Sequence, residues 1–338
     1  MSSPTDKFKG WARQQFDDGA QDLLNFGGQK RNAVAFLDIA GNDSTAVIGD
    51  CARPFRTAQY AYSSGASVIY VGVGSFNGYT GISGVDRDIT LLGVGADVSI
   101  IGPITGTRGN IYGNGCENIT IGEVTWQVPA GANGADQTMD TNSPGGTGTA
   151  GTDAPNCIVA GVNCTGDVIL QAGAGGAGGQ GSNVTNAIDE SILPSDGGPG
   201  GNGGAAGTLT VRNCIVAGYV VSQAGAGGNG GNGGSDWGRI VLGANGGTGG
   251  NEGIVATPAQ VVVINSTVLS AYAASPGPGP GQGGAAGTGV ADGSEGISGA
   301  AYSAGAIAST FATVTIAAAN GEDVTGMHAS MIAGTFTP

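Results

Sequence analysis

The sequence predicts an all-β protein, a parallel β-helix that carries glycine-rich insertions on one side. Three observations lead to this prediction. Short β-branched runs bounded by glycine and asparagine recur along the chain, which is a strand signal. Aromatic residues make up only 6% of the composition, which suits a slim stacked core. The 70 glycines among 338 residues come in local bursts without a chain-long Gly-X-Y period, so collagen is excluded.

The charge is distributed unevenly and limits the classes of partner. Residues 1–56 are neutral, whereas residues 57–338 hold four basic and eighteen acidic residues and carry the entire net charge of -14. Such a body repels phosphate backbones and anionic membranes, so we expect no nucleic-acid binding. No apolar run is long enough for membrane insertion, and the N-terminus lacks the apolar region of a signal peptide. This predicts synthesis in a cytoplasm.

Residues 1–41 predict an N-terminal helix and attachment segment. Apolar residues recur at roughly every fourth position, as on one face of a helix, and Gly27 and Gly28 end the pattern. Two interpretations stay open: the helix caps its own domain, or it docks on a partner or on sister chains. The attachment residues in the second interpretation are Phe8, Trp11, Phe16, Leu23 and Leu24.

The β-helix is predicted to start at residue 42, with its first coils in 42–128. A flat sheet of this many strands would have exposed edges, whereas a solenoid leaves only two ends. The strand runs expected along the chain are 68–71, 89–92, 98–101, 119–121, 158–160, 168–170, 209–211, 214–216, 261–264 and 313–316.

The opening of this region resembles the pectin-lyase-like right-handed β-helix proteins. The resemblance rests on a short helix pattern, then a strand at 68–71, a glycine-rich turn at 72–74 and a strand at 89–93; the helix pattern is Pro54, Phe55, Thr57, Ala58 and Ala61. It covers residues 42–128 and implies a right-handed fold. It implies no particular function, because this fold serves lyases, hydrolases, spikes and spacers alike.

An internal repeat is expected around four asparagines: Asn118, Asn156, Asn213 and Asn265. Asparagine tolerates the left-handed backbone of a sharp turn, so stacked asparagines suit the corners of successive coils. In this alignment Cys157 and Cys214 become stacked, inward-facing core thiols. The odd count of five cysteines, the absence of a CxxC pair and the single His328 give no common zinc set. No metal, cofactor or catalytic residue is predicted.

Residues 129–300 alternate β-helix coils with insertions that read as a glycine run out, a tip and a glycine run back. The runs follow a Gly-Gly-X pattern, as in GAGGAGGQG (173–181) and GAGGNGGNGG (225–234). A period of three matches a polyglycine II helix, whose flat sides can hydrogen-bond to neighbouring helices. An ordered side bundle is one interpretation and flexible linkers are the other. The first insertion, at 129–151, is an abbreviated one.

Stacked coils would place the tips together at the far end of the bundle. This design resembles the receptor-binding adhesins of some tailed phages, which present specificity segments between polyglycine II helices. The resemblance implies a virion location, other virion proteins as partners, and a host receptor or glycan as ligand. Trp237 either contacts that ligand or covers the bundle edge. The candidate contact residues are Met139, Asp140, Asp189, Glu190, Leu193, Asp236, Trp237, Arg239, Asp292 and Glu295.

Three other functions are weighed against the adhesin. A capsid decoration protein fits the same features. A polysaccharide lyase or glycosidase needs paired carboxylates in one groove, and the nearest pairs are Asp86 with Asp88, and Asp189 with Glu190. A spacer or ice-binding protein would show regular threonine ladders, which are weak here. Residues 301–338 are expected to form a last coil and contacts in a homotrimer.

Overall fold

The computed structural model describes residues 34–75, 81–137, 142–184, 193–235, 261–271, 281–288, 294–298 and 309–316. Within these ranges, 17 strands form one continuous sheet in which every strand pairing is parallel. The strands are β1 (Val34–Leu37), β2 (Val68–Val71), β3 (Gly74–Ser75), β4 (Ile82–Val85), β5 (Ile89–Leu92), β6 (Ser99–Ile100), β7 (Ile104–Gly106), β8 (Ile111–Gly113), β9 (Thr120–Ile121), β10 (Val124–Gln127), β11 (Cys157–Ala160), β12 (Asn163–Cys164), β13 (Val168–Gln171), β14 (Leu209–Arg212), β15 (Ile215–Gln223), β16 (Val261–Ala271) and β17 (Ser309–Ile316).

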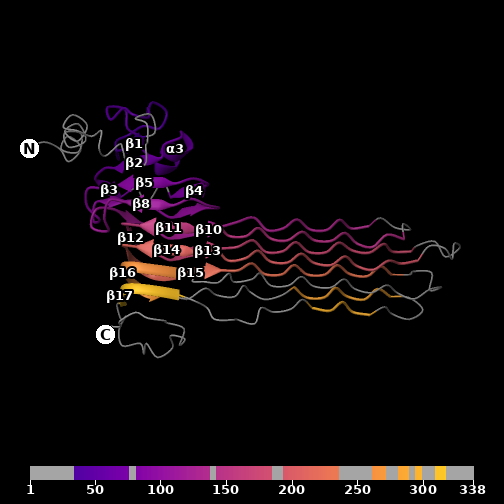
Figure 1. The fold of residues 1–338 in the computed structure, drawn as a ribbon. Coiled ribbons are helices and arrows are strands. Elements are labelled where there is room, and N and C mark those ends of the chain that lie inside the picture. The colour runs from indigo at the N-terminus through magenta and orange to yellow at the C-terminus, as the bar shows by residue number, and fades with distance from the viewer. Residues whose placement is uncertain are drawn as a thin grey trace, which may run out of the picture.

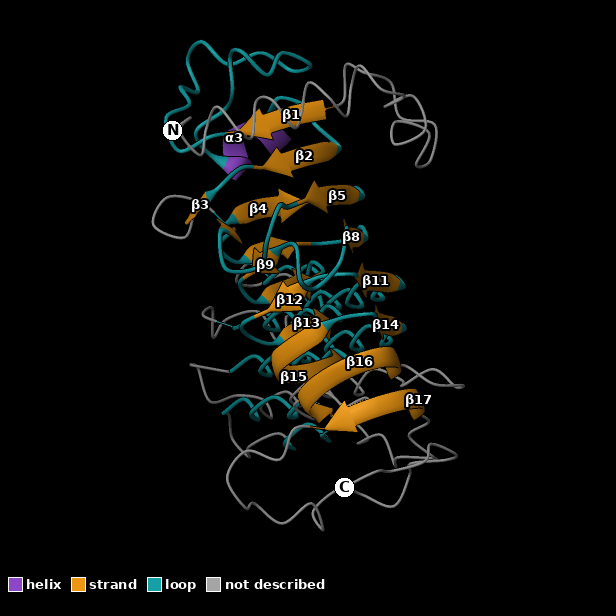
Figure 2. Cartoon of the chain, turned by 90° about the vertical axis from the view of Figure 1, so that its left-hand side faces the viewer, coloured by secondary structure: helices purple, strands orange, loops and turns teal. Residues whose placement is uncertain are grey.

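The sheet is curled, and its strands stack from β1 at one end to β17 at the other (Figure 2). One column of paired strands runs β1–β2–β5–β8–β11–β14–β16–β17. A second runs β4–β7–β10–β13–β15, and a third runs β3–β6–β9–β12–β15. Strand β15 belongs to two columns because it continues through a corner that earlier coils turn. The arrangement is consistent with the predicted parallel β-helix. All ten predicted strand runs overlap a strand of the structure.

The core lies between the columns and consists of branched aliphatic side chains in vertical stacks. Ile89, Ile111, Val159, Val211 and Val263 occupy successive coils at one level, and each is fully buried. Burying a side chain of this size contributes about 1.5–3 kcal/mol. The β-branched runs of the sequence therefore do two things: they favour the extended backbone and fill the interior.

The sheet begins earlier than expected, because β1 lies in the segment predicted to hold only the helix and attachment region. All four β1 residues are buried, with Ala35 and Leu37 in the main core and Val34 and Phe36 in a second cluster. This strand is buried on both faces, so it lacks the alternation that marks a half-buried strand. The first strand that the structure describes therefore begins at Val34, within the segment 1–41 that the sequence assigned to the helix and attachment region.

The short helix expected after Pro54 is confirmed as α3 (Ala58–Ser63). Thr57 caps it, since its side-chain oxygen accepts a hydrogen bond from the Tyr60 N–H. Ala58 and Ala61 face inward and are fully buried together with Phe55. The helix and Phe55 therefore close the N-terminal end of the core.

The predicted asparagine alignment is wrong for one of its four members. Asn213 and Asn265 do lie at one level, and both have a left-handed backbone with φ of 52° and 47°. The residue at this level in the preceding coil is Gly161, with φ of 65°, because Asn163 pairs with Ile215. Asn156 lies elsewhere. Glycine satisfies the same backbone requirement without penalty, so aligning only asparagines missed it.

Cys157 and Cys214 are buried as predicted, but they are not stacked on each other. Cys157 pairs with Leu209 in the first column. Cys214 precedes β15 and lies one residue before Ile215, the partner of Asn163. The stacking followed from the asparagine alignment and is corrected with it.

Four insertions leave the sheet between consecutive strands, and their described parts extend to one side of it (Figure 1). They connect β10 to β11, β13 to β14, β15 to β16 and β16 to β17, and they comprise 29, 37, 37 and 37 residues. The first is therefore the short one, as expected. No helix among the residues described here has the length and apolar character needed to cross a bilayer.

Candidate recognition surface

The described parts of the insertions form four layers, which together are called the slab. Layers 1, 2 and 4 are described in both an outgoing and a returning segment, and layer 3 in its outgoing segment. Layer 1 comprises 129–137 and 142–156, layer 2 comprises 173–184 and 193–207, layer 3 comprises 225–235, and layer 4 comprises 281–288 and 294–298. Figure 1 shows these segments running side by side away from the strands.

One amide in each group of three residues points along the stack to the next layer. The Gly134 N–H donates to the Ala177 carbonyl at 2.7 Å, and the Gly178 N–H donates to the Asn229 carbonyl at 2.7 Å. The pattern repeats every third residue in both directions along the segment, and the returning segments of layers 1 and 2 follow it as well. Each layer is thus fixed on the layer below it through its backbone.

A second amide in each group crosses between outgoing and returning segments. Thr149 donates to Ala132 at 2.9 Å, Gly176 to Thr149 at 2.9 Å, Gly201 to Gly176 at 2.8 Å, and Gly228 to Gly201 at 2.7 Å. Hydrogen bonds in such a continuous chain polarise one another and gain strength. Two further rows of hydrogen bonds run parallel to this one, on either side of it. One row runs through Pro129, Thr152, Gly173, Gly204 and Gly225, and the other through Ala135, Gly146, Gly179, Gly198 and Gly231.

The third amide faces sideways, and asparagine or aspartate in the layer above often accepts it. The Ala177 N–H donates to Asn133 Oδ1 at 2.9 Å, and the Gln282 N–H donates to Asn229 Oδ1 at 2.9 Å. Asp153 accepts from Ala205 in the same way on the returning side. The X residue of each Gly-Gly-X group is therefore the one that reaches the slab surface, and where it is asparagine or aspartate its side chain also holds the next layer.

Glycine is required inside the slab because neighbouring backbones approach too closely for a side chain. A Cβ added at Gly176 would overlap the carbonyl oxygen of Ala132 in the layer above, and one at Gly228 would overlap that of Gly176. On the returning side, a Cβ at Gly201 would overlap the Thr149 oxygen. All three glycines are buried. The Gly-Gly-X period is therefore a steric requirement of the layers.

A group of serines closes the distal end of the described slab. The Ser182 N–H donates to Ser195 Oγ at 2.7 Å, and that hydroxyl donates to the Ser143 carbonyl. The Gly234 N–H donates to the Ser195 carbonyl at 2.9 Å, which joins layers 1, 2 and 3. Ser182 is fully buried. Sequence reasoning missed this group; its signal was a serine flanking the last glycine group of both segments.

The structure describes two of the predicted contact residues. Leu193 is 50% exposed, and its N–H donates to Asn142 Oδ1, so it lies where the second insertion meets the first. Glu295 is exposed in layer 4. The other predicted contact residues lie outside the described residues: Met139, Asp140, Asp189, Glu190, Asp236, Trp237, Arg239 and Asp292. The same holds for Phe8, Trp11, Phe16, Leu23 and Leu24.

The slab surface is acidic. The described slab segments contain four acidic residues, Asp136, Asp153, Asp196 and Glu295, and no lysine or arginine. Asp136 and Asp153 are exposed on the outgoing and returning sides of layer 1. A ligand bound by these faces would have to be neutral or cationic.

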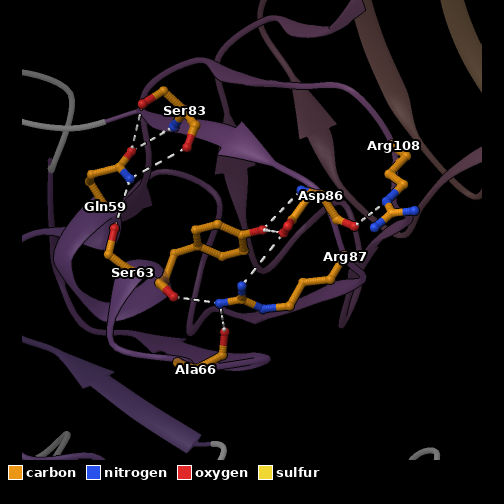
Figure 3. Close-up of polar contacts among 8 residues, drawn as sticks. Gln59, Ser63, Ala66, Ser83, Asp86, Arg87 and Arg108 are labelled. Carbon is orange, nitrogen blue, oxygen red and sulfur yellow. Dashed lines mark hydrogen bonds and ion pairs between the residues drawn. The ribbon is translucent and has the colours of Figure 1, made fainter. Parts of the chain in front are cut away.

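The paired carboxylates Asp86 and Asp88 make structural hydrogen bonds near the N-terminal end. Figure 3 shows the contacts of Asp86. Tyr62 donates its hydroxyl hydrogen to Asp86 Oδ1 at 2.6 Å, and this bond lowers the pKa of Asp86. The Arg87 guanidinium lies 3.8 Å from the Tyr62 ring centroid and donates to the Tyr62 and Ala66 carbonyls. Asp88 accepts from Asn110 of the next coil at 2.9 Å. These contacts fasten α3 to β4 and one coil to the next.

All five cysteines are free thiols. Burial raises the pKa of Cys157 to about 12, that of Cys164 to about 12 and that of Cys214 to about 11. These thiols are unreactive core residues rather than nucleophiles. Within the described ranges, no group of three or more histidine, cysteine, aspartate or glutamate residues is placed to hold a metal ion.

Comparison with known proteins does not assign this chain to a family. No family model and no curated protein matches the chain. A springtail antifreeze protein from Granisotoma rainieri, a bundle of nine polyproline type II helices, is 22% identical over an alignment covering 52% of this chain and 99% of that one. Its TM-score is 0.10, which does not establish a shared fold.

Proposed function

We propose that this chain is a non-enzymatic structural protein of a tailed phage, a tail fibre or spike adhesin that contacts the host surface through the tips of its insertions. In this proposal the coils form a right-handed β-helix stem, and the slab is a bundle of polyglycine II helices. The protein needs no cofactor. It is made in the host cytoplasm and is exposed on the virion.

The hydrogen-bonded distal end of the slab carries the proposal. Ser182 and Ser195 are tied to three layers, so the segment between them starts and finishes at fixed points. Leu193 is held on Asn142 of the first insertion and is still half exposed. Recognition residues commonly lie on loops held by a rigid scaffold. A slab that served only as a spacer would not need its layers joined at the distal end.

The closed N-terminal end of the core supports a docking role for the attachment segment. Phe55, Ala58 and Ala61 already cover the first coil and are fully buried. The apolar stripe predicted in residues 1–27 is then not needed as a cap. We propose that this stripe binds another virion protein, and that residues 301–338 contribute contacts in a homotrimer.

The test is to replace residues 185–192 with a short Gly-Ser linker, leaving Ser182, Leu193 and Ser195 in place. Purified, fluorescently labelled full-length protein is first screened against bacterial strains by flow cytometry. We expect the replacement to abolish labelling of the strains that the parent protein labels, while the melting temperature stays unchanged. The matched control replaces residues 76–80, which follow β3 on the coils, with the same kind of linker, and should keep full labelling.

Retained labelling by the variant with residues 185–192 replaced would overturn the proposal, and so would a parent protein that labels no strain. Gold-labelled antibody on purified particles separates the alternatives by location. Label at a tail or fibre tip fits an adhesin, whereas label spread over the capsid makes the chain a decoration protein.

A further inference from the structure

One position in each group of three residues of the slab faces the layer above. The residue type at these positions differs between layer 1 and the layers beneath it. Ala132, Gly176 and Gly228 are equivalent in layers 1, 2 and 3, because a Cβ at Gly176 meets Ala132 and a Cβ at Gly228 meets Gly176. Within the glycine runs of layers 2 and 3 the described positions of this kind are all glycine, and the exceptions, Ser182 and Ser195, belong to the serine group at the distal end; the glycines are Gly173, Gly176, Gly179, Gly198, Gly201, Gly204, Gly225, Gly228 and Gly231. Their layer 1 equivalents are Pro129, Ala132, Ala135, Gly146, Thr149 and Thr152.

Five of these six layer 1 positions therefore carry a side chain where the stack beneath allows none. The five are exposed: Pro129, Ala132, Ala135, Thr149 and Thr152. In layers 2 and 3 the equivalent glycines are buried under the preceding layer. The side chains of layer 1 stand on the open edge of the slab, as the polar caps of repeat proteins stand on their terminal repeats.

Two backbone donors of this edge, at positions 129 and 132, are removed as well. In lower layers the N–H at this position donates across the slab, as from Gly176 to Thr149. In layer 1, Pro129 has no N–H, and the Ala132 N–H donates to the Thr149 side-chain Oγ1 at 2.6 Å. The same hydroxyl lies 3.3 Å from the Ala132 carbonyl oxygen. An exposed row of unpaired amides is a template for edge-to-edge association.

We infer that layer 1 is an edge cap that prevents a second copy of this chain from docking on the open edge of the slab. The partner it excludes is another copy, because two such edges are self-complementary. In layer 2 this face presents both a donor, the Gly176 N–H, and an acceptor, the Ala177 carbonyl, to the layer above. An uncapped layer 1 would present the same two kinds of group, and a two-fold axis would place donors of one copy against acceptors of the other. The blocking groups are the five side chains and the Thr149 hydroxyl bond. This inference does not depend on the proposed function.

The test opens the edge with the substitutions Ala132→Gly, Ala135→Gly, Thr149→Gly and Thr152→Gly in one variant. Sedimentation velocity over a concentration series should show a species of twice the parent mass that grows with concentration. The matched control replaces four sideways-facing alanines with glycine: Ala174→Gly, Ala177→Gly, Ala205→Gly and Ala226→Gly. It gains the same number of glycines without opening the edge, and it should sediment like the parent.

An edge-opened variant that is folded and sediments like the parent at every concentration would refute the inference. Association of the control to the same extent would refute it too, since glycine content alone would then be the cause. If the fourfold variant does not fold, the double variant Ala132→Gly and Ala135→Gly decides. We expect it to associate more weakly in the same direction, and a parent-like profile would count against the cap.

Discussion

The coils and the slab follow one register but are held together by different forces. Gln127, Gln171 and Gln223 pair at the ends of β10, β13 and β15, and the hydrogen bonds continue into the insertions from Val128 to Gln171 and from Ala172 to Gln223. Behind this line, branched side chains fill a core. Beyond it, the described interior of the slab is mostly backbone, and its contacts are hydrogen bonds between glycines.

The difference shows what each region needs in order to fold. Ordering the backbone costs about 1–2 kcal/mol per residue, and glycine loses the most freedom. The coils offset this cost by burying apolar surface. The slab has about one net hydrogen-bond gain of 0.5–1.5 kcal/mol to set against each ordered residue, which leaves it near balance. We therefore expect the coils to act as a template, since they fix the spacing and register at which the segments enter.

Placing a side chain inside the slab gives the largest expected effect. Gly176→Val puts atoms where the Ala132 oxygen lies, so layers 1 and 2 must separate. We expect the slab to lose about 4 kcal/mol or more of stability. Limited proteolysis should then cleave the insertions while the coils stay intact. Ala177→Val at the adjacent sideways-facing position is the control and should resist proteolysis. Intact insertions in Gly176→Val would mean that the layers do not depend on close approach.

Removing a large core side chain from the coils tests whether the slab depends on them. Trp126 on β10 is 1% exposed and lies directly before the first insertion. Trp126→Ala should cost about 3–5 kcal/mol in a denaturant titration. Because the coils template the slab, we expect a protease to cleave the coils and the insertions of this variant together. A slab that stays protected after the coils have unfolded would contradict the template.

Alkaline pH should distinguish the stability of the coils from that of the slab without any substitution. Burial raises the pKa of Cys157 from 9.0 to about 12, and Cys164 and Cys214 shift in the same direction. The stability that these neutral thiols contribute is fully present below pH 9 and is lost as the pH rises through their folded values. We expect thermal unfolding of the coils to become easier above pH 9. A triple Cys157→Ala, Cys164→Ala and Cys214→Ala variant should show less of this loss, and an equal loss would assign it to other groups.

The sequence was informative about strands and about the glycine runs for the same reason, namely that each has a short period. Runs such as 168–170 and 209–211 appear as β13 and β14 because β-branched residues both favour and fill them. Two-residue strands such as β12 have no period to detect. β1 was missed because it is buried on both faces and precedes the recognised pattern.

The candidate surface was less predictable because it depends on which layers are neighbours. The Gly-Gly-X period identified the slab segments, but only the register reveals that Ala132 and Gly176 are equivalent. Matching asparagine to asparagine placed Asn156 on the wrong level, since Gly161 takes that corner. The serine group at Ser182 and Ser195 joins three insertions, and no local pattern reports such a contact.

Breaking one sideways-facing hydrogen bond gives the smallest expected effect and tests the ladder most directly. Asn229→Ala removes the acceptor for the Gln282 N–H, which then meets water. A net hydrogen bond is worth about 0.5–1.5 kcal/mol, and an exposed site should lie at the low end of that range. Native-state hydrogen exchange should accelerate at Gln282 and stay unchanged at Gly230, whose own bond runs to the Gln282 carbonyl. Gln180→Ala, a sideways-facing residue of layer 2, is the control and should leave exchange at both amides as in the parent. Unchanged exchange at Gln282 in Asn229→Ala would show that the side-chain ladder adds nothing to the backbone bonds.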